Sequence, residues 1–205
     1  MSFKETCTDS DLVRFMLKGD EEALTVLFRR RQGNIYRFTL HMSGSRSLAE
    51  DITQEVFMVL MRESETFDEA RGSLNSFLLG IARNLVRQKL SREQFYVSLS
   101  DNSSDAAIAH GLQTAGELFD DLDRNETIKS VRKAVLSLPE RYREVVVLCD
   151  LQEMSYLEAS CILNCAIGTV RSRLHRARAL LLEKLQPVSE ETPAHPKIKS
   201  ARCFA

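Results

Sequence analysis

Apolar residues recur at three- and four-residue steps along nearly every segment of this 205-residue chain. Such spacing places them on one face of an α-helix, whereas a half-buried strand would alternate apolar and polar residues. No convincing alternating run is present. The composition, with 43% hydrophobic residues, 8 glycines and 4 prolines, is ordinary for a helix-rich chain. The sequence therefore predicts an all-α fold.

Four helices that can close one core are predicted in the first part of the chain. Ser47 and Glu50 have the spacing of a capping box and predict the start of the third helix. The polar residues 64–72 are predicted to form a loop before the fourth helix. On that helix the expected buried residues are Leu74, Phe77, Leu78, Ile81 and Leu85. The predicted helices span about 9–18, 21–42, 47–63 and 73–94.

An acidic stretch separates these helices from a second helical unit. The whole chain carries a net charge of −1, but residues 93–125 contain seven acidic residues and one arginine. This stretch is rich in Ser, Asp and Ala and has weak periodicity, so it is predicted to be a flexible linker. The predicted organisation is a first domain over 1–95, a linker over 96–122, a second domain over 123–186 and a disordered tail over 187–205.

The second unit is predicted to contain helices over about 123–136, 139–149, 155–163 and 168–185, and a helix-turn-helix between Ser155 and Leu182. Ser155 and Glu158 form a second capping box, and Asn164 stands at the turn, where a residue tolerant of positive φ is needed. The spacing of Val170, Leu174 and Ala177 predicts that they face inward, and the segment 168–182 has four arginines and no acidic residue. Arginines on a helix in the major groove can bind guanine edges or phosphates. The predicted DNA-contacting residues are Thr169, Arg171, Ser172, Arg173, His175 and Arg176.

Several motifs resemble bacterial sigma factors of the extracytoplasmic-function group of the sigma-70 family. SYLEA at 155–159, GTVRSRLHRAR at 168–178 and LPERYREV at 138–145 are similar to the part of the family that reads the minus-thirty-five promoter element. AEDITQEVF at 49–57 resembles its polymerase-binding helix, and FLLGIARN at 77–84 resembles its minus-ten reading helix. The resemblance implies a sigma factor that binds core RNA polymerase, reads both promoter elements and helps to melt the DNA.

The resemblance also implies residue roles in the first domain. Residues that contact the polymerase clamp helices are expected to be Asp51, Gln54, Glu55, Phe57 and Met58. Residues that contact the minus-ten DNA, including a flipped base, are expected to be Arg71, Asn75, Phe77, Arg83, Asn84 and Arg87. Phe77 stands where the family commonly has Trp, and Gln88 where it commonly has an acidic residue, so the promoter preference stays open. An anti-sigma factor is an expected partner, and the linker is expected either to enter the RNA exit path or to act only as a tether.

Other functions are less well supported by the sequence. A stand-alone helix-turn-helix regulator would not need the 51–57 face or the long linker. Cys149, Cys161, Cys165 and His175 could form a zinc or redox site, but they include no CxxC pair. No constellation typical of an enzyme and no cofactor or metal motif stands out. Five cysteines without a regular framework, no signal peptide and no apolar stretch of membrane-spanning length favour a cytoplasmic protein.

Overall fold

The computed structural model describes residues 6–100 and 126–185, with side chains described over 6–92 and 126–185. All regular structure in these two ranges is helical, which confirms the predicted fold class. The first unit contains α1 Asp9–Leu17, α2 Glu21–Ser43, α3 Arg46–Glu63, the short 3-10 helices η2 Ser64–Thr66 and η3 Glu69–Arg71, and α4 Leu74–Ser100. The second contains α6 Glu126–Leu136, α7 Glu140–Val146, the π-helical turn η4 Val147–Leu151, α8 Tyr156–Leu163 and α9 Ile167–Leu185.

The start of α3 differs from the prediction. Gly44 ends α2 in the left-handed conformation, with φ of 76°, and its N–H donates to the Leu40 carbonyl. Because this closes α2 within one residue, the next helix can begin at once. Ser45 is its N-cap and accepts a hydrogen bond from the Leu48 N–H at 3.3 Å. The predicted capping box of Ser47 and Glu50 is therefore wrong by two residues.

The four helices of the first unit share one core, as predicted. α2 packs against α1, α3 and α4, and the largest fully buried side chains include Leu12, Leu27, Phe38, Ile52 and Leu78. α4 is rotated relative to the prediction. It buries Leu79, Ala82 and Val86, while Phe77, Ile81 and Leu85 are only half-buried.

The second unit is built around the helix-turn-helix. α9 packs against α6, α7 and α8, and it directs Val170, Leu174 and Ala177 into the core, as the spacing predicted. α7 is shorter than the predicted helix over 139–149, because the chain changes to the π-helical turn at Val147. π-helical turns often occur at functional positions. This turn carries Asp150, which pairs with α9.

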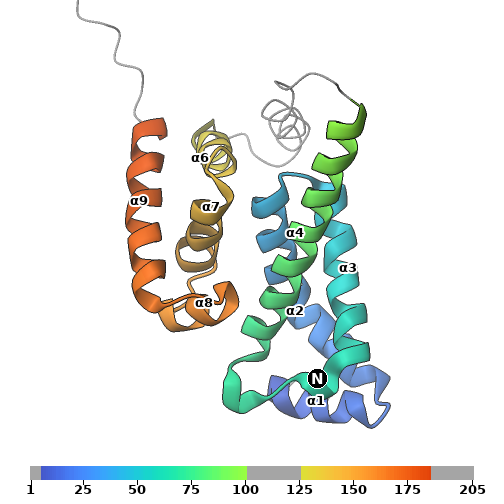
Figure 1. Cartoon of the computed structure of the whole chain (residues 1–205). Helices are drawn as coiled ribbons and strands as arrows, with labels where there is room; N and C mark the ends of the chain where they lie inside the picture. The colour runs from blue at the N-terminus through green and yellow to red at the C-terminus, as the bar shows by residue number, and fades with distance from the viewer. Residues whose placement is uncertain (1–5, 101–125, 186–205) are drawn as a thin grey trace, which may run out of the picture.

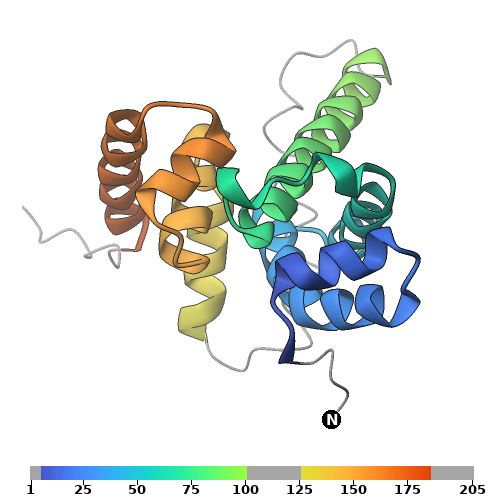
Figure 2. The same ribbon diagram turned by 90° about the horizontal axis from the view of Figure 1, so that it is seen from below.

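The two units lie against each other, and the sequence did not predict this. In Figure 1 the bundle of α1–α4 stands beside the group α6–α9, and Figure 2 shows α8 next to the start of α4. α4 packs against α8, and α2 packs against α6, α7 and η4. α4 continues to Ser100, five residues beyond the predicted domain boundary at 95. The remaining linker residues, 101–122, and the predicted tail, 187–205, lie outside the described residues.

Candidate nucleic-acid interface

The helix-turn-helix is held by hydrogen bonds at both ends of α8. Ser155 Oγ accepts from the Glu158 N–H at 3.2 Å, and the Glu158 carboxylate accepts from the Ser155 N–H at 3.0 Å, which confirms the capping box. The Ser155 hydroxyl also donates to the Glu158 carboxylate at 2.7 Å, and this bond, together with the one from the Ser155 N–H, lowers the pKa of Glu158 below its ordinary value. Asn164 closes α8 with φ of 50° and ψ of 52°, the left-handed conformation predicted for the turn.

The polar residues of α9 point away from the core. Arg171, Ser172, His175 and Arg176 are exposed, and Thr169 and Arg173 are partly exposed. Because Val170, Leu174 and Ala177 anchor the opposite side, the register of this polar face is fixed. All six predicted minus-thirty-five residues are thus available to a ligand.

Two arginines of α9 have partners within the second unit. The Arg178 guanidinium donates to both oxygens of Asp150, at 2.6 and 3.1 Å, and this hydrogen bonding raises the pKa of Arg178. The guanidinium carbon of Arg171 lies 5.8 Å from the centroid of the Tyr156 ring. Arg178 therefore ties α9 to η4, while Arg176 belongs to the exposed face.

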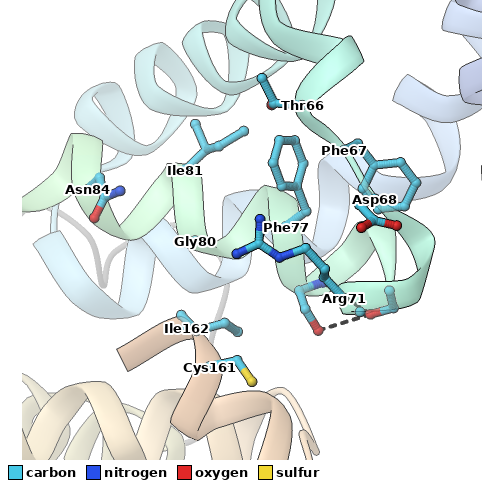
Figure 3. A pocket seen from close by; sticks show the side chains of 13 residues that line it. Thr66, Phe67, Asp68, Arg71, Phe77, Gly80, Ile81, Asn84, Cys161 and Ile162 are labelled. Atoms are coloured by element: carbon cyan, nitrogen blue, oxygen red, sulfur yellow. Dashed lines mark hydrogen bonds between the residues drawn. The ribbon is translucent and has the colours of Figure 1, made fainter. Parts of the chain in front are cut away.

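A cavity of about 380 Å³ lies beside the start of α4. Its walls come from residues 64–71, which contain the 3-10 helices η2 and η3 (the 3-10 segment), from α4 and from α8 of the second unit (Figure 3). Phe67 and Phe77 form a tilted aromatic pair in this wall, with ring centroids 5.6 Å apart. An aromatic wall with polar groups around it suits an unstacked base. The lining residues are Thr66, Phe67, Asp68, Arg71, Gly72, Ser73, Ser76, Phe77, Gly80, Ile81, Asn84, Cys161 and Ile162.

Three of the six predicted minus-ten residues line this cavity: Arg71, Phe77 and Asn84. Asn75 does not line it, and its side-chain oxygen lies 3.4 Å from the Asn34 amide nitrogen. Phe67 and Asp68 were not named individually, although they lie in the loop 64–72, which by the resemblance was expected to help capture the flipped base. An aromatic residue in an otherwise polar loop was the available signal for Phe67, since an apolar ring in such a loop needs a partner.

The other two predicted residues, Arg83 and Arg87, contact the second unit. Arg83 Nε lies 2.5 Å from Glu144 Oε1, and its side chain is only 12% exposed. Arg87 Nε lies 3.0 Å from Glu140 Oε1. In this arrangement of the two units the Arg83 guanidinium is buried, whereas Arg87 is half exposed beside its carboxylate partner.

The proposed polymerase-binding face of α3 is mostly exposed. Asp51, Gln54 and Met58 are exposed, whereas Glu55 is half-buried and pairs with Lys89 of α4 at 2.9 Å. Phe57 is 4% exposed and packs on Phe28, with ring centroids 4.8 Å apart. Its prediction as a contact residue is therefore wrong, because it belongs to the core.

Met61 was missed on this face. It is 48% exposed, and Met58 is 47% exposed, so two large apolar side chains reach the surface one helical turn apart. The spacing of three residues after Met58 was a sufficient signal. The exposed part of the face consists of Asp51, Gln54, Met58, Met61 and Arg62.

The cysteines do not form a metal site in the described part of the chain. Within it, no group of three or more His, Cys, Asp or Glu side chains is placed to hold a metal ion. Among the described residues, Cys7, Cys149, Cys161 and Cys165 form no disulfide bond. Burial raises the pKa of Cys149 to about 11, which keeps its thiol protonated and unreactive at neutral pH. Over the same residues, no helix is both long and apolar enough for a membrane span.

Comparisons with known proteins agree with this geometry. The family model for Sigma-70 region 2 matches residues 27–96, and that for Sigma-70, region 4 matches residues 128–181. The chain is 30% identical to the ECF RNA polymerase sigma factor SigE of Mycolicibacterium smegmatis, over 94% of this chain and 78% of that protein. It is also 30% identical to the ECF RNA polymerase sigma-E factor of Escherichia coli, over 90% and 97%.

Two solved structures share the fold. One is the sigma factor RpoE in complex with the anti-sigma factor NepR from Bartonella quintana, with a TM-score of 0.60, 24% identity and coverage of 83% of this chain and 98% of that one. The other is CnrH in complex with the cytosolic domain of CnrY, with a TM-score of 0.61, 22% identity and coverage of 85% and 95%.

The region 2 match favours a sigma factor over a stand-alone helix-turn-helix regulator, because it covers α3 and α4 outside the helix-turn-helix. Relatives at 30% identity match at least nine tenths of the chain. The protein therefore belongs to the extracytoplasmic-function (ECF) RNA polymerase sigma factors, which direct promoter-specific transcription.

Proposed function

We propose that three surfaces of this sigma factor have separate roles in transcription initiation. The exposed face of α3 binds core RNA polymerase, the cavity beside α4 holds the minus-ten strand, and the outer face of α9 reads the minus-thirty-five element. The observation that carries this proposal is the cavity between the 3-10 segment and α4. It combines a pair of aromatic rings with Arg71 and Asn84, as a site for an extruded base requires.

The minus-ten site uses Phe77 for stacking and Asn84 for hydrogen bonding. The side chains of Phe77, Arg71 and Asn84 lie along the same cavity in Figure 3. Extruding a base costs a few kcal/mol, and stacking on an aromatic ring recovers about 1–3 kcal/mol per base. Phe77 can stack but has no indole N–H, so base selection depends on the polar lining, including Asp68 and Asn84.

At the other end, Arg173, Arg176 and the neighbouring polar residues of α9 contact bases or phosphates. Specific promoter binding then needs both units, because each unit reads only one of the two promoter elements. The partners on this proposal are core polymerase, promoter DNA and an anti-sigma factor, the kind of partner seen with RpoE from Bartonella quintana. The chain works in the cytoplasm, supplies binding energy for DNA melting and carries no catalytic activity of its own.

Run-off transcription with core RNA polymerase on promoter fragments of the host tests the proposal. The full chain plus core polymerase should yield transcripts with defined start sites, and neither component alone should do so. Arg176→Ala should weaken holoenzyme binding to the mapped promoters by about 1–3 kcal/mol if Arg176 is bidentate to guanine. Arg178→Ala is the matched control, because Arg178 is held by Asp150, and it should lose less. Equal losses for both would contradict the assignment of the α9 face.

A further inference from the structure

The exposed face of α9 has a middle and two edges. With about 3.6 residues per turn, Ser172 lies opposite the buried side of the helix, whereas Arg171 and Arg178 form a row along one edge. α8 packs against α9, and Figure 1 shows α8 beside the start of α9. The row of arginines meets Tyr156 of α8 and Asp150 of η4. It therefore lies where other helices of the second unit can orient its side chains.

The two arginines of this row are held in different ways. Arg178 donates from Nε and Nη2 to the two oxygens of Asp150, so its charge and these donors are used within the chain. The guanidinium carbon of Arg171 lies over the Tyr156 ring, 5.8 Å from its centroid. An aromatic ring attracts a cation through its π face and takes up none of the N–H groups of a guanidinium. Arg171 is thus restrained and is still able to donate to a ligand.

The Tyr156 ring is itself held at a defined place. Tyr156 is the first residue of α8, and the capping box of Ser155 and Glu158 fixes the backbone at this point. A tyrosine side chain has few torsions, so holding it in one position costs little conformational entropy. Tyr156 is 37% exposed, so its contact with Arg171 lies at the surface of the helix-turn-helix. The ring therefore offers the Arg171 guanidinium a fixed surface that DNA can reach.

We propose that Tyr156 is a positioning residue for the minus-thirty-five element, and that its ring holds the Arg171 guanidinium toward a phosphate at the edge of the major groove. Base edges lie under the middle of a helix in this groove, and the phosphates flank it. Ordering a long arginine side chain on binding costs entropy, and the ring restricts Arg171 before DNA binds. Phosphate contacts set the register of a protein on the duplex, so Tyr156 influences how α9 is aligned with the bases. This inference rests on the proposed assignment of the α9 face to DNA.

Binding of the holoenzyme to a labelled fragment of a mapped promoter tests this role, with fluorescence anisotropy measured at several salt concentrations. Tyr156→Ala should weaken binding about two- to fivefold, the fold-change expected for the loss of an exposed cation–π contact. Tyr156→Phe keeps the ring and should bind as wild type does. Leu157→Ala is the matched control, because it removes a large side chain that is 61% exposed from the same turn of α8. It should also bind as wild type does.

Arg171→Ala shows whether Tyr156 acts through the arginine. This variant should bind more weakly, and the slope of log affinity against log salt concentration should be shallower by about 1, because one phosphate contact is lost. Tyr156→Ala keeps the guanidinium, so its slope should stay near the wild-type value. In the double variant, Tyr156→Ala should add no further loss, because the side chain that it positions is absent. A merely structural role of Tyr156 would instead lower the affinity in both backgrounds.

The melting temperature of each free chain, followed by circular dichroism, reports whether the variants fold. If Tyr156→Ala melts abnormally, Tyr156→Leu takes its place in the same measurements. Leucine keeps an apolar side chain at the start of α8 but has no aromatic ring, so Tyr156→Leu should show the same two- to fivefold loss.

The possible outcomes separate this inference from the proposed function. The positioning role would be overturned by no loss for Tyr156→Ala, by an equal loss for Tyr156→Phe, or by a loss for Tyr156→Ala that persists in the Arg171→Ala background. An unchanged salt slope for Arg171→Ala would overturn the phosphate contact. In each of these cases a loss for Arg176→Ala would still support the α9 face. Wild-type binding by both Arg171→Ala and Arg176→Ala would remove the assignment of that face to DNA, and this inference with it.

Discussion

Ser155 and Glu158 fix the position at which the first helix of the helix-turn-helix begins. Each side chain binds the backbone N–H of the other, so two amides that α8 cannot pair internally are satisfied. The Ser155 hydroxyl also donates to the Glu158 carboxylate at 2.7 Å, and this bond is the main reason why the pKa of the Glu158 carboxyl is lowered. This pair of residues therefore makes the start of α8, and with it the stability of the second unit, sensitive to pH.

Ser155→Ala should destabilise the second unit by about 1 kcal/mol, the usual cost of losing an N-cap. The Glu158 pKa is lowered by folding, so its contribution is present above its unfolded pKa and is lost as pH falls through its folded pKa. The difference in unfolding free energy between wild type and Ser155→Ala should therefore shrink in acid. Urea unfolding followed by circular dichroism at pH 7 and in acid measures this.

Ser130→Ala is the control for this measurement, because Ser130 is an exposed serine of α6. Its stability should stay close to wild type at both pH values. A loss for Ser155→Ala that does not change with pH would show that the bond from the Ser155 hydroxyl to the Glu158 carboxylate does not contribute to stability.

At the scale of the helices, features that depend on the residues of one helix and its turn could be predicted from the sequence, whereas features that depend on the packing of several helices could not. Asn164 and the inward residues Val170 and Leu174 follow from the residues of one helix and its turn, and they were correct. The rotation of α4 depends on α2, α3 and α8 together, so Ile81 was assigned to the core although it lines the cavity. Phe57 was assigned to the polymerase contact from the family resemblance, although three- and four-residue steps place it on the same side of α3 as the buried Leu60, where it packs on Phe28.

The α3 face makes a testable prediction as a unit. Asp51→Lys should weaken binding of the full chain to core polymerase, since it reverses the charge of an exposed residue beside Gln54 and Met58. A double substitution of Met58 and Met61 to Ala should weaken it as well, because exposed apolar side chains of this kind contribute strongly to interfaces. Fluorescence anisotropy of labelled chain titrated with core polymerase gives both affinities.

Glu63→Lys is the matched control for the charge reversal. Glu63 is exposed at the end of the same helix but lies on the other side of it, so its substitution should leave the affinity near the wild-type value. If Asp51→Lys binds core polymerase as wild type does, the assignment of this face is refuted. The melting temperature of each variant confirms that the fold is intact.

At the scale of the whole molecule, the contact between the two units could not be derived from either part alone. Glu144 stands in the charged run 140–144, which by sequence suits an exposed helix face. It is buried only because Arg83, 61 residues earlier in the chain, meets it across the interface. Both residues have ordinary local surroundings, so no periodicity or motif connects them. The predicted picture of two domains joined by a flexible linker therefore lacked the contact between the two units.

The packing of α2 against α6 makes the stability of the molecule dependent on pH through His41. Its ring nitrogen Nδ1 lies 2.6 Å from the Arg37 carbonyl, to which it donates. Burial lowers the pKa of His41, and the charges of Arg132 on α6 and Arg37 on α2 lower it further. Protonation of this ring in the packed chain therefore opposes both burial and the two guanidinium groups.

Because the His41 pKa is lower in the packed chain than in the unfolded chain, the unfolded chain takes up the proton first as the pH falls. Stability should be highest above the ordinary pKa of 6.5 and should decline below it, until the packed chain is protonated too. His41→Gln removes the titrating ring, so its melting temperature should fall less between pH 7.5 and mildly acidic pH than that of wild type. His175→Gln, which removes an exposed histidine of α9, should keep the wild-type decline. If the melting temperatures of all three proteins fall equally with pH, protonation of His41 does not affect the packing of α2 against α6.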